Sequence, residues 1–379
     1  MGGAAGLPAF GAWVTGEALP LWATRGFDAG AGRFRERLSW AGAPVDVPHR
    51  AMVQARQVYV YAHACRLGWF AEGGAVAERA MASLVRDFAT VGAREASFAY
   101  STDALGRTVS DVRDAYTHAF VLFAVAWLYR LNGDRSLLAL ADKTHAFVRG
   151  SLVDARHGGV WDAYPVASRT KRQNPLMHLL EAYLALERAA PGRGYLEEAR
   201  GIVDLFETRL FEPAAGVLPE HFAEDWGPAA ADAGCAGVWE PGHHFEWVWL
   251  LDEYRRLGGG RVAAADRLYE TARGHGEGSH GLLVDEVGAD LAVRKASHRV
   301  WPHTEAIKAA AARHRAGDAE AALFAGRMAR GLLDHFLGRP FAGGWTDHVD
   351  EAVAPLVGYV PASSLYHLFF AAAEAAPGL

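Results

Sequence analysis

The stretch EPGHHFEWVW, residues 240–249, begins with a glutamate, a proline and a glycine and continues with two histidines and a second glutamate. A proline here is typical of the first turn of a helix, and the apolar residues that follow recur at three- and four-residue spacing. Helices that serve only for packing do not usually carry such residues in their first turn. The stretch therefore predicts a helix whose N-terminal end lines a polar site.

The same arrangement recurs along the chain. One polar residue lies near the start of every second predicted helix, and subtracting successive residue numbers gives separations of 62, 60, 65, 60 and 64. These residues are Arg56, His118, His178, His243, His303 and His367. Helical hairpins of nearly constant length favour a closed ring over an open stack. The pattern predicts an all-α fold, an (α/α)6 barrel, whose six inner helices present polar residues toward one end.

Apolar spacing along the whole chain supports this architecture. It predicts about twelve helices, roughly at 8–25, 50–69, 75–92, 111–131, 135–150, 174–189, 195–211, 241–257, 261–274, 300–315, 317–336 and 362–375. Glycine-containing turns at 157–165, 281–291 and 343–355 predict short β-hairpins that decorate the barrel. No low-complexity linker interrupts the series. We expect one catalytic domain spanning residues 1–379.

The composition excludes several classes of function. The 379 residues are 51% hydrophobic and carry a net charge of −6 without a basic stripe, so we expect no nucleic-acid partner. No secretory leader is recognisable and no apolar run approaches the ~18 to 20 residues that span a bilayer, so we expect no membrane segment. The two cysteines, Cys65 and Cys235, are too few for a disulfide framework. We expect a cytoplasmic protein.

The recurring histidines can be interpreted in two ways. A single histidine on an apolar helix is more often a core residue than a catalyst, but independent core histidines have no reason to keep the period of the hairpins. The register therefore favours a shared pocket. Nearby carboxylates can orient imidazoles on a helix, as Glu246 can for His243 and Glu305 for His303. His244 points to another face than His243, and we expect it to be structural.

Metal chemistry is not indicated by these residues. Neither HExxH nor CxxC is present, and polar residues spread around a ring give no local ligand spacing. We therefore expect no metal ion and no cofactor.

Five stretches taken together are similar to motifs of the N-acylglucosamine 2-epimerase superfamily: VQARQVYVYAHA, DAYTHAFVLFA, NPLMHLLEAYLAL, PGHHFEWVWLL and VWPHTEAIKAA. The resemblance covers essentially the whole chain. It implies an (α/α)6 barrel that acts on the reducing end of free sugars, as a 2-epimerase or as an aldose–ketose isomerase. WTDHVD at 345–350 and PASSLYH at 361–367 resemble the mannose isomerase branch more than the epimerases.

The resemblance implies roles for individual residues. His243 and His367 transfer protons, and Glu246 supports His243. Histidine suits this chemistry because proton transfer between C1 and C2 through a cis-enediol needs a base near neutrality, and its unperturbed pKa is about 6.5. The substrate-binding set, which also draws on the helix register and the neighbouring motifs, is Arg56, Asn174, His178, His118, Trp301, His303 and Asp347. For Trp301, stacking on a sugar ring and filling the core are alternative roles.

We therefore expect an isomerase that interconverts free D-mannose and D-fructose, with D-lyxose and D-xylulose as a further pair, in a monomer or homodimer. A 2-epimerase of the mannose/glucose type on the same barrel is the main alternative. A glycoside hydrolase or lyase is another, for which Glu246, Glu305 and Asp347 offer carboxylates. A third is a barrel that binds sugar or protein without catalysis.

Overall fold

The computed structural model describes residues 6–230 and 235–376. Helices α1 (Gly6–Trp13) and α2 (Leu19–Thr24) are joined by a π-helical turn at Val14–Ala18 into one run. With that run counted once, the described part of the chain has twelve helices, which hold 54% of the residues. The predicted all-α class is confirmed. None of the described helices is both long and apolar enough to cross a membrane.

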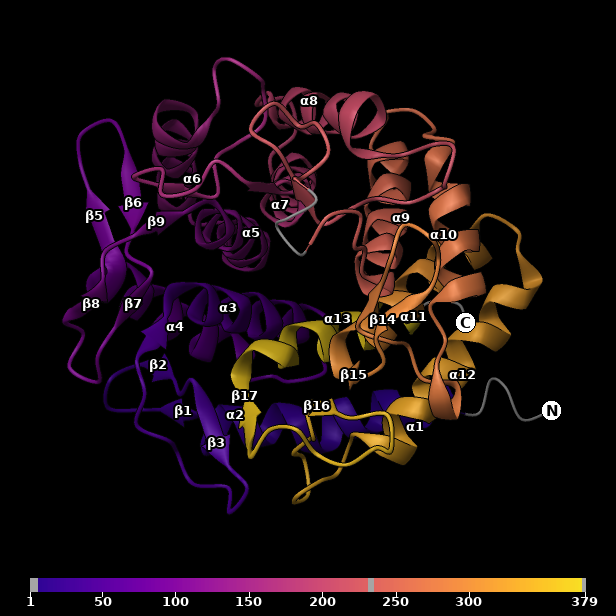
Figure 1. Ribbon diagram of the computed structural model, residues 1–379. Helices are drawn as coiled ribbons and strands as arrows, with labels where there is room; N and C mark the ends of the chain where they lie inside the picture. Colours follow the sequence, from indigo (N-terminus) through magenta and orange to yellow (C-terminus); the bar gives the residue numbers. More distant parts are fainter. Residues whose placement is uncertain (1–5, 231–234, 377–379) are drawn as a thin grey trace.

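The remaining helices alternate between two concentric rings. They are α3 (Ala51–Arg66), α4 (Gly73–Phe88), α5 (Ala115–Asn132), α6 (Arg135–Phe147), α7 (Gln173–Ala189), α8 (Tyr195–Leu205), α9 (Pro241–Arg256), α10 (Ala264–His275), α11 (Val300–Arg315), α12 (Ala319–His335) and α13 (Leu365–Ala375). The inner ring runs through α3, α5, α7, α9, α11 and α13, and α13 contacts α3 again. Figure 1 shows the chain passing once around this ring, from indigo to yellow.

Each outer helix packs on the inner helix that precedes it, and α1 closes the outer ring against α12 and α13. The sequence pattern accounts for the two layers. On α5 every residue from Thr117 to Leu128 is buried, because neighbours surround an inner helix on all sides. On α4 burial follows the three- and four-residue spacing of Ala77, Ala80 and Leu84, because only one face of an outer helix meets the barrel.

Short antiparallel strands decorate one end of the barrel. Their bounds are β1 (Phe27–Asp28), β2 (Arg33–Phe34), β3 (Arg37–Ser39), β4 (His49–Arg50), β5 (Ala89–Val91), β6 (Ala96–Phe98), β7 (Ser101–Thr102), β8 (Thr108–Ser110), β9 (Arg113–Asp114), β10 (Ala163–Tyr164), β11 (Lys171–Arg172), β12 (His221–Phe222), β13 (Glu286–Val287), β14 (Val293–Lys295), β15 (His298–Arg299), β16 (His348–Val349) and β17 (Tyr359–Pro361). Strands β4, β9, β11 and β15 lead directly into α3, α5, α7 and α11. The strands therefore gather where the inner helices begin.

One strand pair joins the two ends of the chain. Strand β17 lies antiparallel to β3, with Val360 opposite Leu38. This pair brings the segment that leads into α13 beside the segment that precedes α3.

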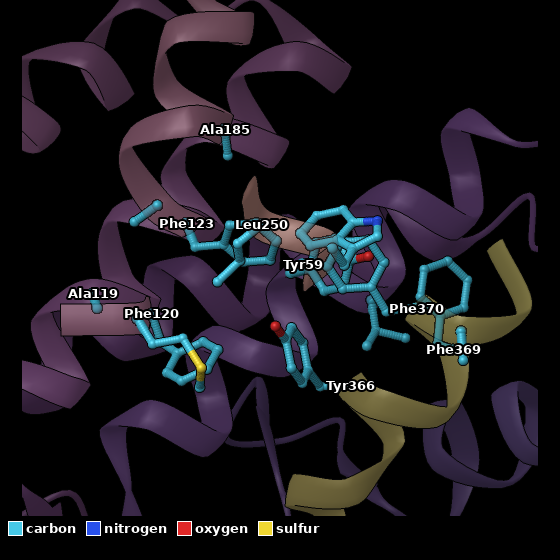
Figure 2. Packing of buried hydrophobic residues seen from close by; sticks show 14 of the residues in the cluster. Tyr59, Ala119, Phe120, Phe123, Ala185, Leu250, Tyr366, Phe369 and Phe370 are labelled. Carbon is cyan, nitrogen blue, oxygen red and sulfur yellow. The ribbon is translucent and has the colours of Figure 1, made fainter. Parts of the chain in front are cut away.

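An aromatic cluster fills the middle of the barrel (Figure 2). The ring centroid of Tyr59 on α3 lies 4.6 Å from that of Phe123 on α5. It lies 5.5 Å from the centroid of Tyr366 and 5.1 Å from that of Phe370, both on α13. This packing joins three inner helices at mid-height.

Candidate active site

A polar cavity of about 290 Å³ opens at the end of the barrel where the inner helices begin. Each inner helix contributes a side chain from its first two turns: Arg56, Tyr116, His178, His243, Trp301 and His367. The other lining residues are Asn174, Glu240, Glu246, Arg299, Asp347, Ser363 and Ser364. Eight of the ten predicted site residues therefore line one cavity. They meet because equivalent positions of parallel inner helices face the same mouth.

His243, the third residue of α9, is held by a carboxylate from the loop before the helix. Its Nδ1 lies 2.9 Å from Oε2 of Glu220, and its Nε2 lies 2.9 Å from the side-chain amide of Asn174, which can present its Oδ1 to a protonated ring. Burial disfavours the charged imidazole, but the negative charges of Glu220 and Glu240 outweigh burial and raise the pKa of His243 to about 10. His243 is therefore an imidazolium near neutral pH and can donate a proton.

His367, the third residue of α13, has the opposite character. Its Nδ1 donates a hydrogen bond to Oε1 of Glu305 at 2.7 Å, and Oε2 of Glu305 lies 2.7 Å from Nζ of Lys308. Burial lowers the pKa of His367 to about 4, although the contact with Glu305 opposes this shift. His367 is therefore neutral near pH 7, and its Nε2 is free to accept a proton.

The indole of Trp301 lies beside both histidines. Its ring centroid is 4.8 Å from that of His243 and 5.8 Å from that of His367. Two imidazoles with oppositely shifted pKa values thus flank one aromatic surface. Such a divergence identifies an acid and a base within one site.

Arg56 supplies a fixed positive charge to the cavity. Its Nη2 donates to the Tyr116 hydroxyl at 2.6 Å, and its Nη1 donates to the Ser363 carbonyl at 3.2 Å. The guanidinium carbon lies 4.2 Å from the ring centroid of Phe120 and 4.8 Å from that of Tyr366. Aromatic packing and two hydrogen bonds hold the cation in one orientation.

The predicted support of His243 by Glu246 is corrected by these contacts, because Glu220 makes that hydrogen bond. Glu246 lies instead on the side of His178, with its Oε1 3.9 Å from Nδ1 of His178. Burial and the charge of Glu305 raise the pKa of Glu246 well above its usual value. This shift favours the protonated form of the Glu246 carboxyl, which lines the cavity.

Asp347 reaches the cavity from the loop before β16. The Ser364 hydroxyl donates a hydrogen bond to its Oδ1. Burial raises the pKa of Asp347. This position fits the predicted contact with substrate.

His118 and His303 do not reach the cavity, and we remove both from the predicted substrate-binding set. His118 donates from Nδ1 to the Asp114 carbonyl and accepts at Nε2 from the main-chain N–H of Phe98 at 3.1 Å. His303 donates from Nδ1 to the Arg299 carbonyl and accepts from the N–H of Leu283 at 2.9 Å. Both ring nitrogens of each histidine are engaged by main chain, so neither is available to a ligand.

This main-chain contact recurs on four inner helices. The fourth residue of α3, α5, α9 and α11 accepts a hydrogen bond from an N–H in the segment before the helix. The acceptors are Gln54, His118, His244 and His303, and the donors are Phe34, Phe98, Leu218 and Leu283. The structural role expected for His244 is confirmed. Histidines can therefore keep the hairpin period for a packing reason as well as a catalytic one.

We expect the His303→Leu variant to lose about 1–3 kcal/mol of unfolding free energy, because the Leu283 N–H is left buried without an acceptor. Its kcat/KM, measured on the folded protein, is expected to stay near the wild-type value. The matched control is His303→Gln, since Gln54 makes the same contact with the Phe34 N–H at 2.8 Å. Urea denaturation of both variants checks this. A large loss of kcat/KM with unchanged stability would show that His303 acts in the active site.

Two groups of side chains have the donor atoms and spacing to hold a metal ion. Within each group the donor atoms lie within 4.8 Å of one another: His178 with Glu181 and Glu246, and Glu220 with Glu240 and His243. In both groups an imidazole Nδ1 already bonds a carboxylate. A metal ion would have to replace that bond. Independence from metals stays a prediction.

Some site residues were outside the predicted set. Glu220, Glu240 and Arg299 come from loops and strand ends before inner helices, and Tyr116 lies two positions before His118. Only Glu220 and Glu240 have a signal in the sequence, since Glu240 is the first residue of the 240–249 stretch and Glu220 lies in the loop before it. The sequence pairs Glu305 with His303, but Glu305 binds His367 on the neighbouring inner helix α13.

The helical barrel is that of a class of enzymes that isomerise or epimerise carbohydrates. Residues 32–371 match the family model of N-acylglucosamine 2-epimerase (GlcNAc 2-epimerase), and the chain belongs to this family.

Two relatives support this assignment. A Rhizobium meliloti (strain 1021) protein named mannose-6-phosphate isomerase is 31% identical over 372 residues, which are 96% of this chain and 94% of the relative. A Thermobifida fusca protein named D-mannose isomerase is 30% identical over 228 residues, 55% of each chain.

Solved structures share the fold. Cellobiose 2-epimerase from Spirochaeta thermophila DSM 6192 gives a TM-score of 0.86 at 24% identity, with 97% of this chain and 95% of that chain covered. A crystal structure of D-mannose isomerase also gives 0.86, at 20% identity, with 97% and 96% covered. The likeness extends to a GH76 α-mannanase of Bacteroides thetaiotaomicron, with a TM-score of 0.70 at 14% identity and 97% and 95% covered. The predicted (α/α)6 barrel is confirmed.

Proposed function

We propose that the barrel is the catalytic domain of an aldose–ketose isomerase that interconverts free D-mannose and D-fructose, and D-lyxose and D-xylulose as a second pair. The observation that carries the proposal is the divergence of two buried histidines at one cavity. The pKa of His367 is lowered to about 4 and that of His243 is raised to about 10. A base and an acid are thus available together over the whole neutral range.

In the proposed reaction, Nε2 of His367 removes the C2 proton of the open-chain aldose and returns it to C1 on the same face. The intermediate is a cis-enediol. As the C1–O5 bond breaks, His243 donates its proton to the ring oxygen and takes up the proton that the O1 hydroxyl loses. Together with Glu246 it then passes a proton to O1 and receives one from O2. Arg56 stabilises the negative charge that develops on these oxygens. The proton count balances, because each group regains its starting state.

The first test follows D-mannose in D2O by NMR. We expect fructose as the first product, with deuterium entering at C1 to the extent that the His367 proton exchanges with solvent. D-mannose 6-phosphate is run in parallel because a relative is named for that sugar. A strong preference for the phosphorylated sugar would overturn the assignment of a free substrate.

A 2-epimerase is the second candidate, and the pair of histidines beside Trp301 favours it specifically. Epimerisation needs acid–base groups on opposite faces of C2, and His243 and His367 approach Trp301 from different inner helices. Glucose accumulating before fructose in the same experiment would select this reaction over isomerisation.

We expect kcat/KM to rise as pH passes through about 4, where His367 loses its proton, and to fall as pH passes through about 10, where His243 loses its own. The Glu220→Gln variant removes a carboxylate that raises the pKa of His243. Its alkaline limb should therefore move to lower pH, while the acid limb stays in place. Glu95→Gln, on the exposed surface, is the control. An unmoved alkaline limb would mean that His243 is not the acid.

A further inference from the structure

A second cavity, of about 270 Å³, opens at the opposite end of the barrel, where the inner helices end. It shares no lining residue with the candidate active site. Every inner helix contributes a polar side chain to it: His63, Arg130, Arg188, Arg256, Arg315 and Glu374. The cavity is thus a property of the whole ring rather than a groove between two helices.

Three of its four arginines are compensated by carboxylates. Arg188 and Arg256 both pair with Glu253, and Arg315 pairs with Glu374 at 3.1 Å. The cavity also contains Glu181, but the two oxygens of that carboxylate accept hydrogen bonds from His178 and Tyr366. The carboxylates that line the cavity are therefore already paired with arginines or hydrogen-bonded to other side chains.

Arg130 is the exception. Among the residues that the structure describes, it has no carboxylate partner, and its Nη1 is buried without a hydrogen-bond acceptor. The guanidinium carbon lies 4.2 Å from the ring centroid of Trp127. Burial and the neighbouring charges of Arg66 and Arg188 lower the pKa of Arg130 to about 10. A buried donor of this kind costs free energy unless something accepts from it.

Helix ends offer a simpler reason for arginines, because the C-terminal end of a helix carries partial negative charge. That role predicts guanidinium groups bound to main-chain carbonyls. Within the described chain only Arg66 makes such a contact here, with the carbonyl of Arg130. The other arginines of the cavity bind side-chain carboxylates. Among the described residues, Arg130 contacts neither a main-chain carbonyl nor a carboxylate. Helix capping therefore does not explain Arg130.

We propose that this cavity is an anion site, in which Arg130 binds a phosphate group, free or carried by a small phosphate ester. Planar guanidinium groups suit phosphate oxygens, and Arg188 and Arg315 line the same cavity from two other inner helices. The aromatic side chains of Trp127 and Trp249 line the remainder of the cavity and can pack against the carbon part of an ester.

The test is isothermal titration of the full chain with inorganic phosphate and, separately, with glycerol 3-phosphate, in a low-salt buffer free of chloride. We expect saturable binding of one equivalent by the wild type. Arg130→Gln should weaken it at least about tenfold, as the loss of a charge-assisted contact does. The control Arg135→Gln removes an exposed arginine of α6 and should bind as the wild type does. Tighter binding of glycerol 3-phosphate than of phosphate would assign the site to an ester.

Two further variants serve as a specificity control and as a substitute for Arg130→Gln. Arg299→Gln removes an arginine from the candidate active site and should leave phosphate affinity unchanged. Arg315→Gln serves as the cavity variant if Arg130→Gln does not fold, and it should also weaken binding. The proposal fails if phosphate does not bind saturably, if the cavity variant that folds keeps wild-type affinity, or if Arg299→Gln abolishes binding.

Discussion

The His367→Asn variant is expected to convert D-mannose with a kcat about 10²- to 10⁴-fold below that of the wild type. Asparagine can keep the hydrogen bond that Nδ1 of His367 gives to Glu305, so the local structure is preserved. It has no counterpart of the Nε2 lone pair, so no base is left to remove the C2 proton. Steady-state kinetics with D-mannose measure the loss, and exchange of the C2 proton in D2O should fall with it.

Sugar affinity should survive in the same variant, because His367 is assigned to proton transfer and not to holding the sugar. Titration of His367→Asn with D-mannose checks this, and His303→Gln is the matched histidine control. A barrel that binds sugar without catalysis would show the same properties in the wild type and the variant. A variant that keeps more than about a tenth of the wild-type kcat would place the catalytic base on another residue.

The Lys308→Met variant is expected to lose about 3–5 kcal/mol of unfolding free energy, the usual result of removing one partner from a buried ion pair. Lys308 is fully buried, its Nζ lies 2.7 Å from Oε2 of Glu305, and its charge also faces Glu246 and Glu181. Methionine keeps the packing against Phe370, whose ring centroid lies 4.3 Å from Nζ. The loss therefore reports the charge left behind, and urea denaturation at pH 7 measures it.

The double variant Lys308→Met/Glu305→Gln should recover part of this loss, since it also removes the unpaired carboxylate. Lys143→Met is the control; Lys143 is a half-buried residue of α6 whose Nζ, among the described residues, donates only to the Gly92 carbonyl at the surface, so its loss should change stability much less. If Lys308→Met alone costs no more than this control, Lys308 does not compensate the buried carboxylates.

The fold could be predicted because its repeating unit is local. The apolar spacing of each helical hairpin is visible in the sequence. The nearly constant length of the hairpins indicates that they form a closed ring. The same period misled in part for the site, because the six periodic residues occupy three different positions of the inner helices. The fourth residue of four inner helices, as in His118 and His303, binds main chain. Residues at the second, third and sixth positions, such as Trp301, His243 and His178, face the cavity.

The partners of the catalytic histidines could not be predicted, for a physical reason. Neighbours on a helix are visible in the sequence, so Glu246 was the natural partner for His243. The actual partner, Glu220, lies 23 positions earlier in a loop, and Glu305 reaches His367 from 62 positions away on another helix. Such pairs form only when segments that are distant in the sequence pack together.

The pairing of β3 with β17 also sets when the enzyme can first work during its synthesis. Five hairpins can emerge from the ribosome and begin to pack, since each contacts mainly its neighbour. His367 follows β17 by a few residues, so the base enters the cavity only after the last segment docks against β3 near the start of the chain. In the proposed mechanism, a nascent chain therefore carries its proton donor, His243, well before its base, His367, and it becomes active in a single late step.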